Sequence, residues 1–429
     1  MSVRSKILMT YGVFFLLISY AMGSGFSLFE QGNKASAMAG AFTATADDPS
    51  AIFYNPGGIA FLSGKQLYVN GNIYTYSGSF SGVDPFPGQG ISEKYKDLSV
   101  FVPSVYYIHP ISDKFTAGVG FYSPFGFSTE WETPQKFTGR FIATRARLSS
   151  YSITPTVAYH FNNNLGVGFG LELRESHITI EKNLPILMLS SNALFDLAYM
   201  KINSGYKMSI AFNAGVLFKF NDTFRVGFTY RHSAKASYSG NASFTLIPLT
   251  TPPGSGIPGV DEIPPEPIPA NMEINFPSTY SFGVAYQPNE DMNLEIDINW
   301  AKWNTFKQIN INFPENPVYD TAREYDYFNT MSARIGAEYK LQSNLIGRAG
   351  YYFDQAPVPD KSIDPFFPDS SRHGICVGLA FIKANLKLEI FNMLVIYQKA
   401  DTMGSNKFNY NGVYKKIADI AGISVNYQW

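Results

Sequence analysis

The chain has 429 residues, with 33 Lys and Arg against 34 Asp and Glu. This balance argues against a nucleic-acid partner held by a strongly basic surface. Cys376 is the only cysteine, which excludes an intrachain disulfide and a metal cluster built on cysteines. Aromatic and charged residues each make up 16% of the chain, a composition that suits membrane strands with aromatic girdles at the interfaces.

The N-terminus carries the features of a secretory signal peptide. Arg4 and Lys6 precede an apolar run over residues 7–21, and Ala21-Met22-Gly23 supplies small residues for the peptidase. This pattern predicts a signal peptide over residues 1–23 and export of the chain. A transmembrane anchor is the alternative, but the run is shorter than the roughly 20 apolar residues that a spanning helix needs.

Residues 24–63 form a stretch of small, helix-compatible residues without the alternation that follows it. A segment of this length can fill the lumen of a wide barrel as a plug. We therefore expect an N-terminal plug, or hatch, over residues 24–63 and a barrel over residues 64–429.

The rest of the chain alternates between apolar and polar residues. Residues 206–220 show the pattern clearly, because every second residue from Tyr206 to Phe220 is apolar and Lys207 and Lys219 lie between them. A strand with this pattern has one oily face and one wetter face. We identify about fourteen such segments, an even number, as single-chain bacterial barrels have. They cover residues 65–77, 98–109, 115–123, 146–161, 165–182, 206–220, 223–239, 276–287, 292–313, 327–340, 345–355, 374–383, 386–399 and 413–429.

The connections between these segments alternate between short and long. Tight polar turns lie at residues 162–164, 221–222, 289–291 and 342–344, and long loops at 183–205, 240–275, 314–326, 356–373 and 400–412. Short periplasmic turns and long extracellular loops are typical of outer-membrane barrels, whereas a soluble sandwich has no reason to sort its loops in this way. The predicted fold is all-β: a transmembrane antiparallel β-barrel of about 14 strands with the N-terminal plug inside.

One predicted outer loop is markedly apolar and suits a helix over residues 184–200. An exposed apolar surface often marks a binding site, although such a loop can also simply pack over the barrel mouth. Another loop, residues 248–269, is rich in proline and suits an extended surface segment. The candidate groove residues of the apolar loop are Leu187, Leu189, Phe195 and Leu197.

The non-alternating stretch resembles the N-terminal hatch of the FadL-type outer-membrane transporters of long-chain fatty acids and aromatic hydrocarbons. That family usually has Asn-Pro-Ala after an Ala-Asp-Asp, and this chain has Asn55-Pro56-Gly57 after Ala46-Asp47-Asp48. Glycine thus replaces the usual alanine at Gly57. The likeness extends over nearly the whole mature chain, through residues 123–131, 224–231, 276–279, 299–303, 350–354 and 368–373.

The resemblance implies a lateral route for the ligand. The ligand would land on an apolar groove between outer loops, move to a pocket above the hatch, and leave sideways where one strand is kinked inward. The hatch residues near this pocket would be Phe26, Leu28 and Phe29. Pro124 can bend the third strand because proline removes a ladder donor, or it can simply end that strand.

A fatty-acid carboxylate would favour a basic side chain, which offers charge-assisted hydrogen bonds. Such residues can equally be charges that face solvent or lipopolysaccharide. Arg225, Arg231 and Lys235 share one face of a predicted strand, and we expect them to pair inside the lumen with Glu295 and Asp297. The candidate head-group cations are Lys136, Arg140, Arg174, His177 and Lys182.

No sequence motif favours an enzyme, because neither Gly-x-Ser-x-Gly nor His-Glu-x-x-His occurs. We expect no catalytic residue, no cofactor and no metal. The predicted function is passive outer-membrane transport of hydrophobic small molecules, with long-chain fatty acids as the first expectation and monoaromatics or alkanes as the alternative. A structural or adhesive surface barrel is the second class. The expected partners are the ligand, membrane lipid and lipopolysaccharide, and the expected state is a monomer.

Overall fold

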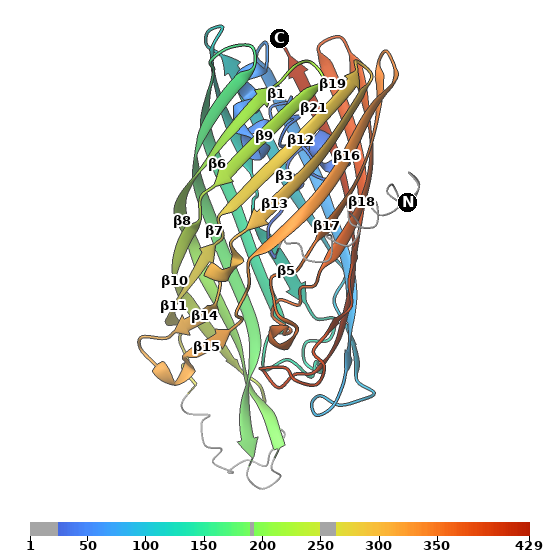
Figure 1. Cartoon of the computed structure of the whole chain (residues 1–429). Helices are drawn as coiled ribbons and strands as arrows, with labels where there is room; N and C mark the ends of the chain where they lie inside the picture. The colour runs from blue at the N-terminus through green and yellow to red at the C-terminus, as the bar shows by residue number, and fades with distance from the viewer. Residues whose placement is uncertain (1–24, 189–192, 249–262) are drawn as a thin grey trace, which may run out of the picture.

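The computed structural model describes residues 25–188, 193–248 and 263–429. Within these residues a ring of 14 antiparallel strands closes where β1 (Gln66–Gly82) pairs with β21 (Gly412–Gln428). Figure 1 shows the strands tilted around one axis, with the short turns and the C-terminus at one end. This confirms the predicted barrel. In this part of the chain, no helix is both long and apolar enough to cross a membrane.

Nine strands of the ring are continuous and five are each built from two consecutive pieces. The pieces belong together because they pair with the same neighbouring strands in the ladder. The continuous strands are β1, β3 (Leu98–Pro110), β6 (Arg145–His160), β7 (Leu165–Met188), β8 (Ala193–Lys219), β17 (Leu345–Asp354), β18 (Arg372–Lys383), β19 (Leu386–Tyr397) and β21. The others are β4 (Phe115–Tyr122) with β5 (Gly126–Glu130), β9 (Phe224–Arg231) with β10 (Ala234–Leu246), β11 (Ile268–Phe276) with β12 (Thr279–Asn289), β13 (Met292–Ala301) with β14 (Gln308–Asn312), and β15 (Thr321–Glu324) with β16 (Thr330–Gln342). Two short strands, β2 (Ser92–Lys94) and β20 (Ala400–Asp401), extend the ladder beside β1 and β21.

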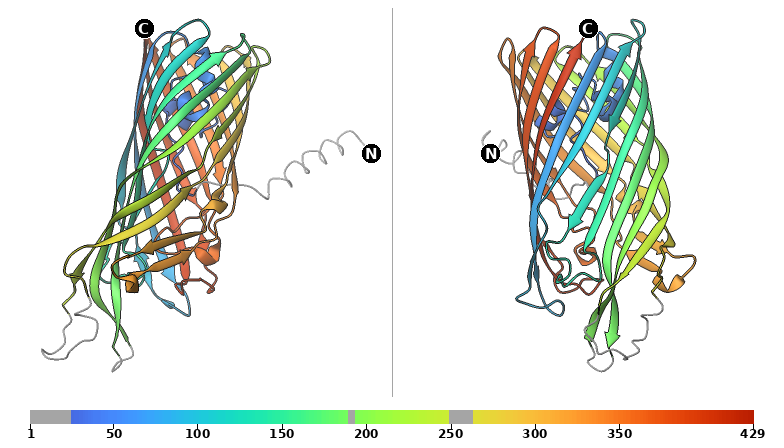
Figure 2. Two further views of the ribbon diagram at one scale, coloured as in Figure 1. Left: turned by 90° about the vertical axis from the view of Figure 1, so that its left-hand side faces the viewer. Right: turned by 180° about the vertical axis from the view of Figure 1, so that it is seen from behind.

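The described parts of the apolar outer stretch, residues 184–188 and 193–200, form strands and not a helix, so that expectation was wrong. β7 and β8 continue beyond the wall as one long hairpin, with Ile186 opposite Phe195 and a register shift at Pro185. The alternation of the two strands simply persists into the hairpin, so that each pair extends the ladder. The hairpin projects past the rest of the barrel at the end opposite the short turns (Figure 2). Most of the proline-rich loop lies outside the described residues.

The N-terminal segment, residues 25–63, lies within the ring (Figures 1 and 2). It contains two short helices, α2 (Asn33–Ala37) and α3 (Ala51–Tyr54), and the 3₁₀ helix η1 (Pro56–Phe61). Helix α2 packs on β17, β18, β19 and β21, and η1 packs on β6, β7 and β8. Nearly all of its residues from 30 to 60 are buried, and its helices contact the inner face of the wall at two separate groups of strands.

Two wall carboxylates on β13 hold the middle of this segment. Glu295 accepts hydrogen bonds from the backbone N–H groups of Ala44 (2.6 Å) and Thr45 (2.8 Å), one on each oxygen. One oxygen of Asp297 accepts from the backbone N–H groups of Phe42 and Thr43, both at 3.0 Å. The wall therefore grips four consecutive peptide groups of the N-terminal segment.

The predicted ion pairs of these carboxylates with the basic residues of the seventh strand are wrong. Arg231 does face inward but pairs with Glu172, and Lys235 pairs on the outer face with Glu273 at 2.8 Å. The strand is interrupted between β9 and β10, and the interruption shifts which alternate residues face inward. The prediction assumed that the same alternate residues face inward along the whole strand, so it could not anticipate this shift.

The replacement of alanine by glycine at position 57 has a steric reason. A Cβ atom on Gly57 would lie 2.9 Å from the carbonyl oxygens of both Gly166 and Gly215. Both neighbours are backbone atoms of the wall, which cannot rotate away as a side chain can. Close approach of the N-terminal segment to the wall therefore requires glycine here.

We expect Gly57→Ala to weaken the attachment of the N-terminal segment by about 1–3 kcal/mol, the usual cost of overpacking. Hydrogen exchange of the backbone amides of residues 55–61 should be faster in the variant, whereas the ladder between β1 and β21 should exchange as before. Unchanged exchange of residues 55–61 would contradict this steric account.

Candidate ligand cavity and exit window

An apolar cavity lies in the lumen beside the start of the N-terminal segment, with Phe26 at its inner end. The Phe26 side chain is only 3% exposed, and its ring centroid lies 4.6 Å from that of Trp303 and 5.6 Å from that of Phe306. The cavity has no polar lining surface. It is lined by Phe26, Phe127, Ile178, Ile180, Met272, Ile274, Phe306, Ile309, Tyr325, Tyr327, Phe366 and Phe367.

Lys182 marks the outer end of this cavity. A second pocket shares Ile180, Ile309, Tyr325 and Phe366 with the apolar cavity and adds the side chains of Lys182 and Arg323. Arg323 pairs with Asp364 at 2.9 Å. Among the described residues, no carboxylate lies within ion-pair distance of the Lys182 ammonium. The outer end of the cavity thus carries one unpaired cation.

The position of Lys182 explains its titration. The exposed apolar side chains of the wall end near Tyr151 of β6 and Tyr206 of β8, which lie opposite Glu175 and His177 of β7, so Lys182 lies beyond the apolar band of the wall. Burial and the nearby Arg323 lower the pKa of Lys182 to about 8. The ammonium is therefore charged at neutral pH and loses its charge above about pH 8.

The other candidate cations occupy different environments. Lys136 is exposed on the loop before β6, and Arg140 is neutralised by Asp196 at 2.7 Å. His177 lies on the outer face of the wall, where it hydrogen-bonds to Asn203. None of these three lines the apolar cavity.

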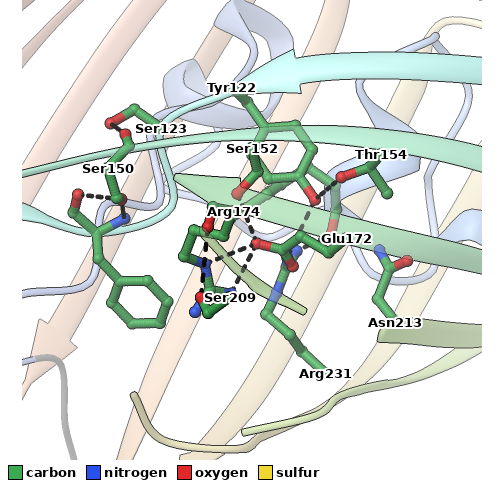
Figure 3. A network of polar contacts seen from close by, with 12 residues as sticks. Tyr122, Ser123, Ser150, Ser152, Thr154, Glu172, Arg174, Ser209, Asn213 and Arg231 are labelled. Atoms are coloured by element: carbon green, nitrogen blue, oxygen red, sulfur yellow. Dashed lines mark hydrogen bonds and ion pairs between the residues drawn. The ribbon is translucent and has the colours of Figure 1, made fainter. Parts of the chain in front are cut away.

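Arg174 is sealed beneath the cavity. Its guanidinium lies 4.7 Å and 4.9 Å from the ring centroids of Phe125 and Phe276, and its Nη2 donates to Glu172 at 2.7 Å. Figure 3 shows Glu172 between Arg174 and Arg231, and Arg231 also contacts Tyr122. One carboxylate thus compensates two buried guanidinium groups in this cluster.

The candidate groove and hatch residues divide into two groups. Leu187 and Phe195 are exposed on the projecting hairpin, Leu197 is buried, and Leu189 lies outside the described residues. Phe29 lies under the guanidinium of Arg334, 4.3 Å from its ring centroid. These four described side chains do not line the apolar cavity.

The third strand of the ring breaks at residues 123–125, around Pro124. β4 pairs with β3 only over residues 105–110 of β3, and residues 98–104 of β3 have no partner on that edge. Instead, the backbone at the break pairs with the N-terminal segment, because Leu28 N donates to Pro124 O at 2.9 Å and Gly126 N donates to Phe26 O at 3.0 Å. At the break, residues 26–28 of the N-terminal segment therefore supply the backbone partners that β3 does not.

This break leaves a window in the wall between β3 and β5. It is bounded at its outer end, where Lys96 N donates to Glu130 O at 2.9 Å, and at its inner end by the pairing of Val105 with Phe121. Seven residues of β3 span about 23 Å at 3.3 Å per residue. Leu28 and Phe127 reach the window pocket from inside, and Phe101 from the lipid side.

Comparison with known proteins identifies the barrel. The family model described as outer membrane protein transport protein (OMPP1/FadL/TodX) matches residues 14–429. The chain belongs to this family.

Two of its solved relatives have the same fold, at low sequence identity. A FadL homologue of Pseudomonas aeruginosa is 20% identical, with a TM-score of 0.81 over 94% of this chain and 100% of its own. The toluene transporter TodX of P. putida is 16% identical, with a TM-score of 0.70 over 96% and 99%. A curated relative, the long-chain fatty acid transport protein of Escherichia coli (strain K12), is 21% identical over 96% of both chains.

As a member of the OMPP1/FadL/TodX family, the chain is an outer-membrane transporter of hydrophobic compounds.

Other lumen residues could have been found from the sequence. Ile178 and Ile180 alternate with outward-facing residues between Arg174 and Lys182, so strand parity alone places them on the inner face. Phe366 and Phe367 could not be found in this way, because they belong to a long loop that folds back into the lumen.

Proposed function

We propose that this protein transports long-chain fatty acids, and that it binds the acyl chain in the apolar cavity and the carboxylate at Lys182. The observation that carries the proposal is the pairing of a wholly apolar cavity with one unpaired cation at its outer end. A ligand that fits this arrangement has a long apolar tail and one anionic head.

The energetics favour a dry route over a water-filled pore. Exposure of an acyl chain to water costs about 0.8 kcal/mol per methylene group. A sixteen-carbon tail therefore resists release into water by roughly 10 kcal/mol or more. A cavity lined by Ile178, Ile180 and a ring of aromatic side chains removes this cost while the ligand is in transit.

The window between β3 and β5 supplies the exit. The N-terminal segment acts as the hatch, because Phe26 closes the inner end of the cavity and Leu28 faces the window. Movement of residues 26–28 would connect the two spaces. The ligand then leaves sideways into the lipid, and its tail meets no water on the way.

The first test is a charge-removing substitution at the outer end of the cavity. Lys182→Gln should weaken binding of hexadecanoate about tenfold to a hundredfold, because a hydrogen bond to a charged group contributes about 1.5–3 kcal/mol. Isothermal titration of the purified barrel measures this effect. Lys201→Gln, a matched change at an exposed residue of β8, should leave the affinity unchanged.

The same ligand should bind less tightly as the pH rises through about 8. The carboxylate stays ionised over that range, whereas Lys182 with its lowered pKa loses its proton. The Lys182→Gln variant should show a flat profile between pH 7 and 9.5. A wild-type profile that is equally flat would remove Lys182 from the site.

Monoaromatic compounds remain the second candidate, because the cavity is lined largely by aromatic rings and because the toluene transporter TodX has the same fold. A neutral aromatic would gain nothing from Lys182. Tight binding of toluene together with hexadecanoate binding that is insensitive to Lys182→Gln would favour this candidate.

A further inference from the structure

Three pockets follow one another from the outer end of the lumen to the window. The apolar cavity shares Phe26, Phe127 and Phe367 with a more polar space, here called the polar chamber. The polar chamber in turn shares Leu28 and Phe127, among others, with the window pocket.

The polar chamber contains an unpaired cation. Lys416 faces inward from β21, and its Nζ lies 4.6 Å from the ring centroid of Tyr397 and 5.5 Å from that of Tyr76. No carboxylate of the described ranges lies within ion-pair distance of Lys416. Arg372, the other cation of the chamber, is in contrast 3.5 Å from Asp354.

The window pocket also contains one cation. Arg147 is the only charged residue that lines it, and no carboxylate in the described part of the chain lies within ion-pair distance of its guanidinium. Arg147 belongs to β6, where it lies opposite Ser128 of β5, and its side chain is exposed on the outer face. Along the same face, Tyr151 and Ile153 are exposed apolar side chains, so Arg147 lies just beyond the apolar band, at the level of the outer interface.

We propose that Lys416 and Arg147 are two further stations for the anionic head group, which it reaches in turn after leaving Lys182. This inference rests on the proposed transport of fatty acids and names the residues that would make the inner route selective for an anionic amphiphile. The second pocket at the outer end of the apolar cavity, the polar chamber and the window pocket each have one cation without a carboxylate partner among the described residues. The tail stays on apolar and aromatic surface while the head group moves from one cation to the next.

The physical reason is the cost of an unpaired buried charge. A carboxylate that enters a low-dielectric interior without a partner costs several kcal/mol even after the protein relaxes. A cation at each station lowers this barrier. The chamber also contains the carboxyl groups of Glu30 and Asp369, which would repel the carboxylate of the ligand. Lys416 would therefore bind the head group only weakly, so that the ligand can move on.

Arg147 would serve the last step. A fatty acid in a membrane leaflet keeps its carboxylate at the interface and its tail in the hydrocarbon region. Arg147 lies at that level beside the window, and Phe101 offers an exposed apolar surface below it. The geometry therefore matches the orientation that the released ligand must adopt.

The test compares an anionic and a neutral ligand of the same chain length. Uptake of radiolabelled hexadecanoate and hexadecanol is measured in cells of a Gram-negative strain that lacks its own fatty-acid transporter and expresses the full chain. Lys416→Gln and Arg147→Gln should each slow hexadecanoate uptake about tenfold, the loss expected for one charge-assisted hydrogen bond. Uptake of hexadecanol should not change, nor should hexadecanoate affinity at Lys182.

Two control variants remove exposed charges. Lys415→Gln makes the same change one residue away on the opposite face of β21, and Lys207→Gln does so on the outer wall. Both should transport hexadecanoate as the wild type does. If Lys416→Gln or Arg147→Gln slows uptake of hexadecanoate and hexadecanol equally, the residue stabilises the fold or binds a lipid phosphate. The proposal is then overturned for that residue.

The proposal and the proposed function fail in different ways. Wild-type protein that neither binds nor takes up hexadecanoate would refute the function itself. Wild-type protein that transports hexadecanoate, with unchanged rates in both variants, would leave the function intact and refute the stations at Lys416 and Arg147.

Discussion

Glu172→Gln is expected to lower the free energy of unfolding by about 3–5 kcal/mol, the largest stability effect that we expect from a single substitution here. Glu172 is fully buried and is the only carboxylate that pairs with Arg174 and Arg231 in the described structure. Its oxygens also accept a hydrogen bond from Ser152 at 2.8 Å. Removal of its charge leaves two buried guanidinium groups without compensation.

The unfolding temperature of the purified barrel, followed by its mobility on gels after heating in detergent, measures this effect. Glu175→Gln is the matched control, because Glu175 lies three residues further along β7 and faces outward. Arg174→Met should cost less than Glu172→Gln, since it leaves the neutral pair of Glu172 with Arg231 and places an apolar side chain between Phe125 and Phe276. The reverse order of the two variants would contradict this charge balance.

The sequence was sufficient to predict the number of strands and the placement of most of them. Strand alternation is a local property, so segments such as 206–220 reveal it without any knowledge of their neighbours. Local patterns do not show where a strand breaks. The interruption between β9 and β10 shifts the inward face, and the interruption between β4 and β5 opens the wall where the backbone bonds to the N-terminal segment instead.

The candidate site was predicted only where strand parity applies. Lys182 was identified as a head-group candidate, and the structure places it at the end of an apolar cavity. Arg174 looked equivalent in sequence, but burial between Phe125 and Phe276 removes it from the cavity. Lys416 was missed. Its distinguishing feature is that no carboxylate of the described residues pairs with its ammonium, and this can be seen only in the folded lumen.

The wall carboxylates of β13 lead to the second large effect, on the N-terminal segment itself. Glu295→Gln is expected to release residues 44–45, whereas Asp297→Asn should be milder. Both oxygens of Glu295 accept a backbone N–H, so the amide of glutamine would place its own donors against one of them. Asp297 uses a single oxygen for its contacts with Phe42 and Thr43, and the carbonyl of asparagine can take the same place.

Each unsatisfied buried donor costs about 1–3 kcal/mol, and the hydrogen bond that remains also loses its charge. Hydrogen exchange of the backbone amides of residues 42–45 should therefore accelerate much more in Glu295→Gln than in Asp297→Asn. Glu290→Gln, in the exposed turn before β13, should leave this exchange unchanged. Equal acceleration in both β13 variants would mean that charge alone, and not the division of oxygens between donors, holds the segment.

If the N-terminal segment acts as the hatch, the same variant should also change permeation. A released segment no longer fills the ring, so single barrels of Glu295→Gln in planar bilayers should conduct ions through the lumen, whereas the wild type should stay closed. Because the double variant with Asp297→Asn alters both carboxyl groups that grip residues 42–45, it should conduct most often. A released segment without conductance would show that the folded outer loops, including Phe366 and Phe367, close the lumen on their own.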